Sequence, residues 1–176
     1  MASAMARPHP IMPKTLSGHP AIRFQASPQL RRAYIPGRPV WIRVHRAYAP
    51  LFLRLCVLLD QVEPLKPTDT WSYNYRPARM AKHTSDHAGY AIDVWSSRQG
   101  RVGERPSPEL KAKVERILAQ FTTANGRRIF GWGGAYQNTP DAMHFFINPT
   151  ITPKDAKEVQ DRLGIRADGT VARINA

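Results

Sequence analysis

Two short segments that carry metal-ligand side chains constrain the fold of this chain more than any other feature. The first, residues 83–95, contains His87 and Asp93, and the second, residues 140–146, contains His144. A catalytic zinc ion is held by three protein ligands of these types and keeps a fourth position open for water. The segments are about fifty residues apart in sequence, so we expect the fold to bring them side by side.

The residues around these ligands have the pattern of strands. Apolar and polar positions alternate with a period of two over residues 89–95, which predicts a strand with Asp93 on one side of a sheet. Residues 143–148 predict a second strand, reached after an intervening helix. Asp141 lies just before that strand, in a predicted turn. It could therefore reach a water molecule at the metal site and act as the general base.

The rest of the chain predicts an α+β domain: a small antiparallel sheet flanked by about three helices, with the zinc site at the strand ends. Helices are predicted over residues 50–61, from residue 107 to a stop at Gly126, and over residues 153–163; further strands are predicted over residues 40–44 and 127–132, with an edge strand or binding loop at 71–76. The first helix is apolar on nearly every side, which predicts a buried position that includes Cys56. Trp95 and Trp132 are expected to pack in the core or at its rim.

Charge and proline are concentrated near the N-terminus. Residues 1–59 contain nine Lys or Arg and no acidic residue, and eight of the 16 prolines lie in residues 1–50. We therefore expect a basic, proline-rich, extended arm over residues 1–45, a zinc-binding domain over residues 46–165 and a polar tail over residues 166–176. Such an arm attracts polyanions over roughly 8–10 Å at physiological salt. Charge alone does not choose among anionic wall polymer, anionic lipid and nucleic acid.

Other features narrow the class of protein. A single cysteine excludes an internal disulfide and a multi-cysteine zinc site. No secretory signal is visible near the N-terminus, and the best apolar run, at residues 49–59, is too short to span a bilayer. We therefore expect synthesis in a cytoplasm without a Sec signal. No recognition helix or aromatic stacking platform is evident in the sequence, which argues against a specific nucleic-acid binder.

These residues also carry a family resemblance. Residues 85–93, Ser-Asp-His-Ala-Gly-Tyr-Ala-Ile-Asp, resemble the Ser-x-His-x-x-Gly-x-Ala-x-Asp signature of the D-alanyl-D-alanine carboxypeptidase and L-alanyl-D-glutamate endopeptidase family of zinc peptidases. Residues 130–136, Phe-Gly-Trp-Gly-Gly-Ala-Tyr, and residues 140–145, Pro-Asp-Ala-Met-His-Phe, are similar to the segment that closes the site in the phage endolysin branch. Tyr75-Arg76 resembles the Tyr-Arg motif of the family.

The resemblance implies hydrolysis of a peptide bond in bacterial peptidoglycan, with the stem peptide as partner and the cell wall as the place of action. It implies one Zn²⁺ per chain, bound by His87, Asp93 and His144. Asp141 would be the base, and Arg76 would stabilise the oxyanion or hold a substrate carboxylate. Arg79 is the alternative if Arg76 points away.

The chain departs from the family pattern in two places. His87 and Asp93 are one residue closer together than in the signature, which keeps His83 open as an alternative ligand. Phe146 follows His-Phe where the family often has Glu. The other hypotheses are a catalytically inactive relative that binds wall peptide or has a structural role in a virion, and a nucleic-acid binder that uses the basic arm. The bond that is cut and the oligomeric state stay open.

Overall fold

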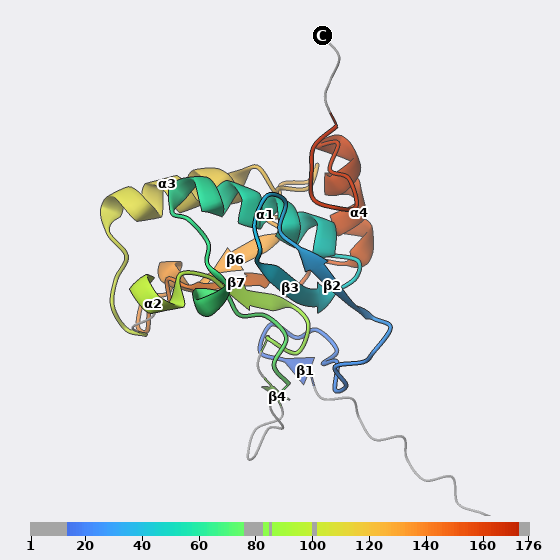
Figure 1. Cartoon of the computed structure of the whole chain (residues 1–176), viewed down its shortest axis with the longest axis horizontal. Helices are drawn as coiled ribbons and strands as arrows, with labels where there is room; N and C mark the ends of the chain where they lie inside the picture. The colour runs from blue at the N-terminus through green and yellow to red at the C-terminus, as the bar shows by residue number, and fades with distance from the viewer. Residues whose placement is uncertain (1–13, 76–82, 85, 100–101, 173–176) are drawn as a thin grey trace, which may run out of the picture.

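A three-stranded antiparallel sheet is the platform on which the rest of the fold is built. The computed structural model describes residues 14–75, 83–84, 86–99 and 102–172 (Figure 1). The sheet has the order β5-β7-β6, with β5 at Ala91–Asp93, β7 at His144–Ile147 and β6 at Phe130–Trp132. Its register pairs Asp93 with His144 on adjacent strands. Directly opposite residues of an antiparallel pair have Cβ atoms about 4.5–5.5 Å apart, so the register alone brings these two side chains together.

Four α-helices lie within the described residues. They are α1 at Ala49–Val62, α2 at Ser96–Gln99, α3 at Pro108–Ala119 and α4 at Pro153–Arg162, with 3-10 turns η1 at Pro67–Asp69 and η2 at Gly133–Ala135. Helices α1 and α3 contact each other on one side of the sheet, and α4 lies at one end of α1 (Figure 1). Ser107 caps α3 and Thr152 caps α4 by accepting hydrogen bonds from backbone N–H groups.

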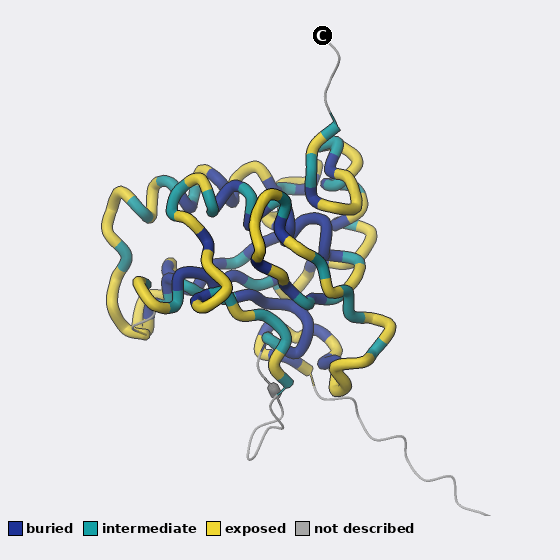
Figure 2. The backbone as a smooth tube through the Cα atoms, in the orientation of Figure 1, coloured by how far each residue is buried: buried dark blue, intermediate teal, exposed yellow. Residues whose placement is uncertain are grey.

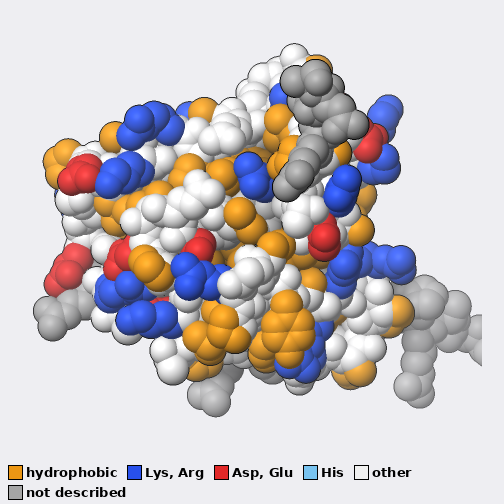
Figure 3. All heavy atoms as spheres, turned by 45° about the horizontal axis from the view of Figure 1, so that its top comes forward, with side chains coloured by type: hydrophobic (Ala, Val, Ile, Leu, Met, Phe, Trp, Pro, Cys, Tyr) orange, Lys and Arg blue, Asp and Glu red, His pale blue; other side chains and the backbone are white. Residues whose placement is uncertain are grey.

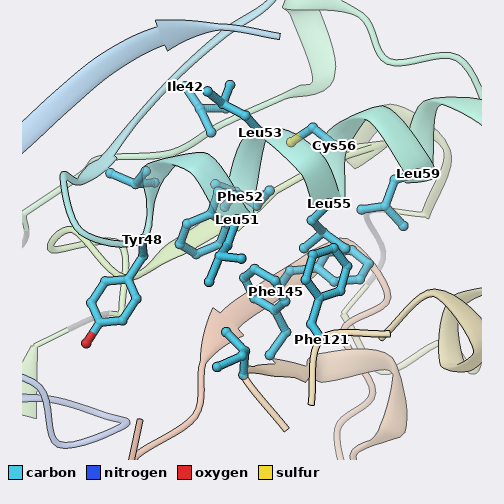
Figure 4. Packing of buried hydrophobic residues seen from close by; sticks show 14 of the residues in the cluster. Ile42, Tyr48, Leu51, Phe52, Leu53, Leu55, Cys56, Leu59, Phe121 and Phe145 are labelled. Atoms are coloured by element: carbon cyan, nitrogen blue, oxygen red, sulfur yellow. The ribbon is translucent and has the colours of Figure 1, made fainter. Parts of the chain in front are cut away.

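Helix α1 is the centre of the hydrophobic core, as its sequence predicts. Nine of its residues are buried, among them Phe52, Leu55 and Cys56. Figure 4 shows Phe52 and Leu55 on the side of α1 that faces Phe121 and Phe145, and Cys56 on the opposite side, toward Leu53 and Ile42. Among the described residues, those of α1 and of the sheet strands are mostly buried, and those of the outer loops are mostly exposed (Figure 2). Within the described residues, no helix combines the length and apolar character needed to cross a bilayer.

Two further strand pairs complete the fold. Strands β2 at Leu30–Tyr34 and β3 at Trp41–His45 form an antiparallel hairpin that contacts α1. Strands β1 at Lys14–Thr15 and β4 at His83–Thr84 form a short parallel pair below the main sheet (Figure 1). The prediction of an α+β fold with a small antiparallel sheet and helices around it is confirmed.

The structure corrects the expected extended arm. Residues 14–45 include the β2–β3 hairpin, and Ile35, Ile42 and Val44 of this region are buried in the core. Pro28, Pro36 and Pro39 lie in turns or bends, and Pro20 lies at an isolated bridge to Lys14, positions that a residue without a backbone N–H group tolerates. At the other end, Ile165 forms a bridge with Val171, so the described part of the expected tail folds back on the domain. Residues 1–13 and 173–176 lie outside the described residues.

The C-terminal end of one helix also differs from the prediction. Helix α3 ends at Ala119, before the expected stop at Gly126. Gly126 lies in a tight turn in which the Thr123 N–H donates to the Arg127 carbonyl and the Gly126 N–H donates to the Thr123 carbonyl, each at 2.9 Å. The chain leaves the helix early because Phe121 is buried in the core, which directs the following residues toward β6.

Candidate metal centre

Three side chains, from His87, Asp93 and His144, meet at one end of the sheet. Asp93 ends β5 and His144 begins β7, and the strand register places them opposite each other. His87 comes from the turn before β5, which is closed by a hydrogen bond from the Tyr90 N–H to the Asp86 carbonyl. One ligand atom from each of the three side chains lies within 4.8 Å of the others. The three are partly buried, with side-chain exposures of 13–17%.

His87 is held in one orientation by a backbone carbonyl. Its Nδ1 lies 2.7 Å from the Ser72 carbonyl oxygen. A carbonyl only accepts hydrogen bonds, so Nδ1 carries the proton and donates it. In the neutral ring, Nε2 therefore presents a lone pair. That atom lies 3.1 Å from Oδ1 of Asp93.

His144 has a similar arrangement with a carboxylate on its outer side. Its Nδ1 lies 2.9 Å from the same oxygen, Oδ1 of Asp93, and its Nε2 lies 3.9 Å from Oδ2 of Asp86. Burial alone would lower the pKa of His144, but hydrogen bonding to Asp86 and Asp93 raises the pKa of His144 to about 9. Burial would likewise raise the pKa of Asp93, yet the two imidazoles hold the pKa of Asp93 well below its ordinary value. The centre therefore favours a positive charge between the two rings and Asp93.

This donor set fits a metal ion. In the neutral state of His87, two acceptor atoms, Nε2 of the ring and Oδ1 of Asp93, face each other, and a cation is needed to make that contact favourable. Ligand atoms of a tetrahedral zinc site are roughly 3.3 Å apart, given bonds of about 2.0–2.1 Å. The contacts of 2.9 and 3.1 Å are close to that spacing, so small side-chain shifts would open the site. The group could hold a metal ion.

Asp86 links the centre to the N-terminal segment. It is buried, and Ser17 donates two hydrogen bonds to its Oδ1, from the backbone N–H at 2.8 Å and from the hydroxyl. Burial alone would raise the pKa of Asp86, but hydrogen bonds from His144, Ser17 and Thr15 hold it below its ordinary value. An ionised Asp86 therefore faces the outer nitrogen of His144. Such carboxylate–histidine pairs fix the ring orientation of a metal ligand and increase its basicity.

Asp141 lies in the turn before β7, next to the metal group. Its backbone N–H donates to the Gly133 carbonyl at 2.9 Å, and its carbonyl accepts from the His144 N–H at 3.2 Å. A Cβ at Gly133 would lie 2.6 Å from the Asp141 carbonyl oxygen, so this close approach requires glycine. Trp132 secures the same turn through a hydrogen bond from Nε1 to the Ala142 carbonyl at 2.9 Å. The Trp-Gly-Gly segment thus positions Asp141.

The carboxylate of Asp141 has the environment of a proton acceptor. Its Oδ1 is buried and has no hydrogen-bond partner among the residues that the structure describes. Burial raises the pKa of Asp141, and the negative charge of Asp93 adds to this, against the opposing effect of His144. A carboxylate with a raised pKa and a free acceptor atom is suited to general base catalysis near neutral pH.

Cavities open on both sides of the metal group. One, of about 390 Å³, is lined by Leu16, Ser17, Asp86, Tyr136, Asp141, His144, Phe146 and Pro149. The other, of about 520 Å³, is lined by Trp71, Ser72, Tyr73, Asn74, His87, Asp93, Ser96 and Met143. The first cavity therefore reaches His144 and Asp141, and the second reaches His87 and Asp93.

The structure brings together four of the five predicted site residues. His87, Asp93, His144 and Asp141 lie around the centre, whereas Arg76 and its alternative Arg79 fall outside the described residues. His83 lies in β4, and its side chain is likewise not described. Trp95 and Trp132 are buried, as expected of core residues.

Sequence reasoning missed the groups around the ligands. Asp86 belongs to the same sequence motif as His87. An acidic residue next to a candidate ligand could have suggested that Asp86 supports a ligand without binding the metal itself. Ser17 and the Ser72 carbonyl lie in segments without a recognisable motif. Tyr136 and Phe146 line the cavity beside Asp141, and the His144 ring stacks on Phe146 with centroids 5.5 Å apart. The aromatic Phe146 thus packs directly against a ligand.

Comparison with protein-family models, with curated proteins and with solved structures finds no match for this chain. The function is therefore inferred from the chemistry of the site and from the motifs that form it.

Proposed function

We propose that the protein is a zinc-dependent peptidase that hydrolyses peptide bonds of bacterial peptidoglycan, of the endolysin or wall-remodelling type. The observation that carries this proposal is the convergence of His87, Asp93 and His144 beside Asp141. The peptidoglycan substrate comes from the resemblance of the ligand and Trp-Gly-Gly segments to that peptidase family.

Zinc fits the donor set better than the common oxygen-seeking cations. Two imidazole nitrogens and one carboxylate are typical of catalytic zinc sites with three protein ligands. Calcium and magnesium favour sites built from oxygen ligands. A bound zinc ion would supply a Lewis acid for the scissile carbonyl and a water of lowered pKa.

The chain's own residues would then direct the reaction. Asp141, which lines the cavity beside His144, accepts a proton from the attacking water and returns it to the leaving amine. Asp86 and the Ser72 carbonyl keep both imidazole rings oriented toward Asp93. The substrate chain lies across the two cavities, with Tyr136 on one side of the scissile bond and Trp71 on the other. The resemblance assigns contact with a substrate carboxylate or the oxyanion to Arg76.

The test uses zinc-loaded protein and purified peptidoglycan of several chemotypes. We expect new amino groups to appear, and mass spectrometry of the fragments to identify the bond that is cut. Asp141→Asn should lower the rate by about 10²–10⁴-fold while keeping its zinc. The control is Asp161→Asn, which makes the same change at an exposed position on α4. Wild-type protein with full zinc occupancy that releases no amino groups from any chemotype would rule out the proposal and favour an inactive relative.

A further inference from the structure

The outer face of the β2–β3 hairpin combines exposed aromatic rings with arginines. The strand register pairs Arg32 with Arg43 and Tyr34 with Trp41. The guanidinium carbon of Arg32 lies 4.2 Å from the centre of the Trp41 ring, and that of Arg43 lies 5.7 Å from it. Tyr34 is 61% exposed and Trp41 is 39% exposed. Figure 3 shows hydrophobic side chains exposed directly beside Lys and Arg side chains on one face of the molecule.

These two arginines have no acidic partner among the described residues. Arg38, Arg98, Arg127 and Arg128, by contrast, form ion pairs with carboxylates. Like charges directly opposite each other on neighbouring strands destabilise a sheet. Arg32 and Arg43 therefore weaken the hairpin, and stacking on Trp41 offsets this cost only in part. An anionic ligand would neutralise both charges.

This face is continuous with the candidate metal centre. A cavity of about 290 Å³ lies between them, and its lining includes Trp41, Trp71 and Tyr73. Trp71 and Tyr73 also line the cavity that contains His87 and Asp93. Trp71 and Tyr73 thus line both the cavity beside the hairpin and the cavity that contains two of the candidate metal ligands.

Backbone contacts join the same segments. The Trp71 N–H donates to the Asp93 carbonyl at 2.8 Å, and the Asp93 N–H donates to the Trp71 carbonyl at 2.9 Å. The Arg43 N–H donates to the Ser72 hydroxyl at 2.9 Å, and the carbonyl of Ser72 orients His87. The hairpin face and the metal centre are therefore held in a fixed relation.

We propose that this aromatic–arginine surface, formed by Arg32, Tyr34, Trp41, Arg43, Trp71 and Tyr73, binds the glycan strand of peptidoglycan while the attached peptide enters the metal centre. Sugar rings present apolar faces that pack on aromatic side chains. Arginine binds carboxylates in a bidentate manner, and the stem peptide attached to the sugars carries free carboxylates. This inference rests on the proposed function, because the continuity with the metal centre selects a polymer that joins sugar and peptide.

Single-stranded nucleic acid also stacks on aromatic rings beside basic residues, so the test includes it. Full-length protein is mixed with insoluble peptidoglycan sacculi, and the fraction that sediments is measured; binding to oligothymidylate is measured in parallel. We expect Trp41→Ala and Arg32→Gln each to weaken binding to sacculi about tenfold. Trp41→Phe should restore it, because the ring is kept. Arg166→Gln and Val171→Ala remove an exposed arginine and a partly exposed apolar side chain elsewhere and should bind as wild type does.

Thermal melting of each variant shows whether the fold is kept, and Arg32→Gln keeps the test decisive if Trp41→Ala does not fold. Sedimentation needs no catalysis, so it remains informative if the proposed peptidase activity is not found. If activity is found, the loss in Trp41→Ala should be about tenfold greater on sacculi than on a soluble stem peptide. Unchanged binding to sacculi in both variants would overturn the inference. The inference would also be overturned if these variants lost binding to oligothymidylate but still bound sacculi as the wild type does.

Discussion

Atoms outside the three candidate ligands set the orientation of the two imidazole rings at the centre and, for His87, the position of the ring proton. The Ser72 carbonyl fixes the proton of His87 on Nδ1, and Asp86 faces the outer nitrogen of His144. Both inner nitrogens are thereby turned toward Asp93 before any metal arrives. A site preorganised in this way loses less entropy on binding than one whose rings must be reoriented.

Asp86→Asn tests this role directly. The amide oxygen can still accept hydrogen bonds from Ser17, so the turn should be kept. The negative charge facing His144 is lost, and zinc affinity should fall about 10–100-fold. Competition with a chelator of known affinity measures this change, with Asp161→Asn as the control. Equal affinity in the variant and wild type would show that Asp86 does not support the site.

At this scale the sequence predicted the ligands and missed their supports. Residue type, the alternation around Asp93, the turn before His144 and the resemblance of both segments to a zinc-peptidase family selected His87, Asp93, His144 and Asp141. The hydrogen bond from Ser17 to Asp86 spans 69 residues. It depends on tertiary packing that no local pattern encodes.

At the scale of elements, strand register and one tight turn decide what the centre can do. The β5–β7 register pairs two ligands, and a slip by one residue would move one of them to the other face of the sheet. The turn before β7 holds Asp141 against Gly133. If the proposed function holds, metal binding and proton transfer depend on different elements and can be separated by substitution.

Gly133→Ala should separate them. The added methyl group would lie 2.6 Å from the Asp141 carbonyl oxygen, so the turn must shift. Because a displacement of about 1 Å can lower a rate by 10²-fold, we expect activity to fall by about that factor. Zinc content should stay at the wild-type level, because the three candidate ligands belong to β5, to β7 and to the turn before β5. A variant that loses zinc and activity together would show that the turn supports the ligands as well.

The sequence pattern predicted the core helix, the strands of the main sheet and the strand over residues 40–44, and it missed β1, β2 and β4. The apolar helix α1 and the strands at both ligand segments were found because their patterns extend over several residues. Residues 14–45 were expected to form an arm because of their prolines and charge. Ile35, Ile42 and Val44 instead bury this region against α1. The strand expected over residues 40–44 corresponds to β3, whereas its partner β2 lies in the stretch expected to be an arm and is stabilised by pairing with β3.

At the scale of the whole molecule, the core and the metal centre belong to one domain. Phe145 of β7 packs between Trp95 and Trp132, one residue after the ligand His144. Zinc binding to the folded state should therefore stabilise the entire core. At a free zinc concentration 100 times the dissociation constant, this stabilisation is about 2.7 kcal/mol.

Cys56 provides a probe of that stability. It is fully buried in α1, and burial raises the pKa of the Cys56 thiol well above its ordinary value. A raised thiol pKa favours the folded state at neutral pH, and this contribution is lost as pH rises above about 8.5. At pH 8, reaction with iodoacetamide should therefore follow unfolding. Zinc at 100 times the dissociation constant should slow it about 100-fold in wild type and not in His144→Ala. Rapid alkylation of the native protein would contradict a buried Cys56.

The central claim is that His87, Asp93 and His144 bind one zinc ion together. X-ray absorption spectroscopy at the zinc edge, on protein loaded with one equivalent, tests it most directly. We predict two imidazole nitrogens at about 2.0–2.1 Å and oxygen ligands completing a four-coordinate site, with the bound metal lost in His144→Ala. Wild-type protein that retains no zinc, or a spectrum that is unchanged in His144→Ala, would contradict the account.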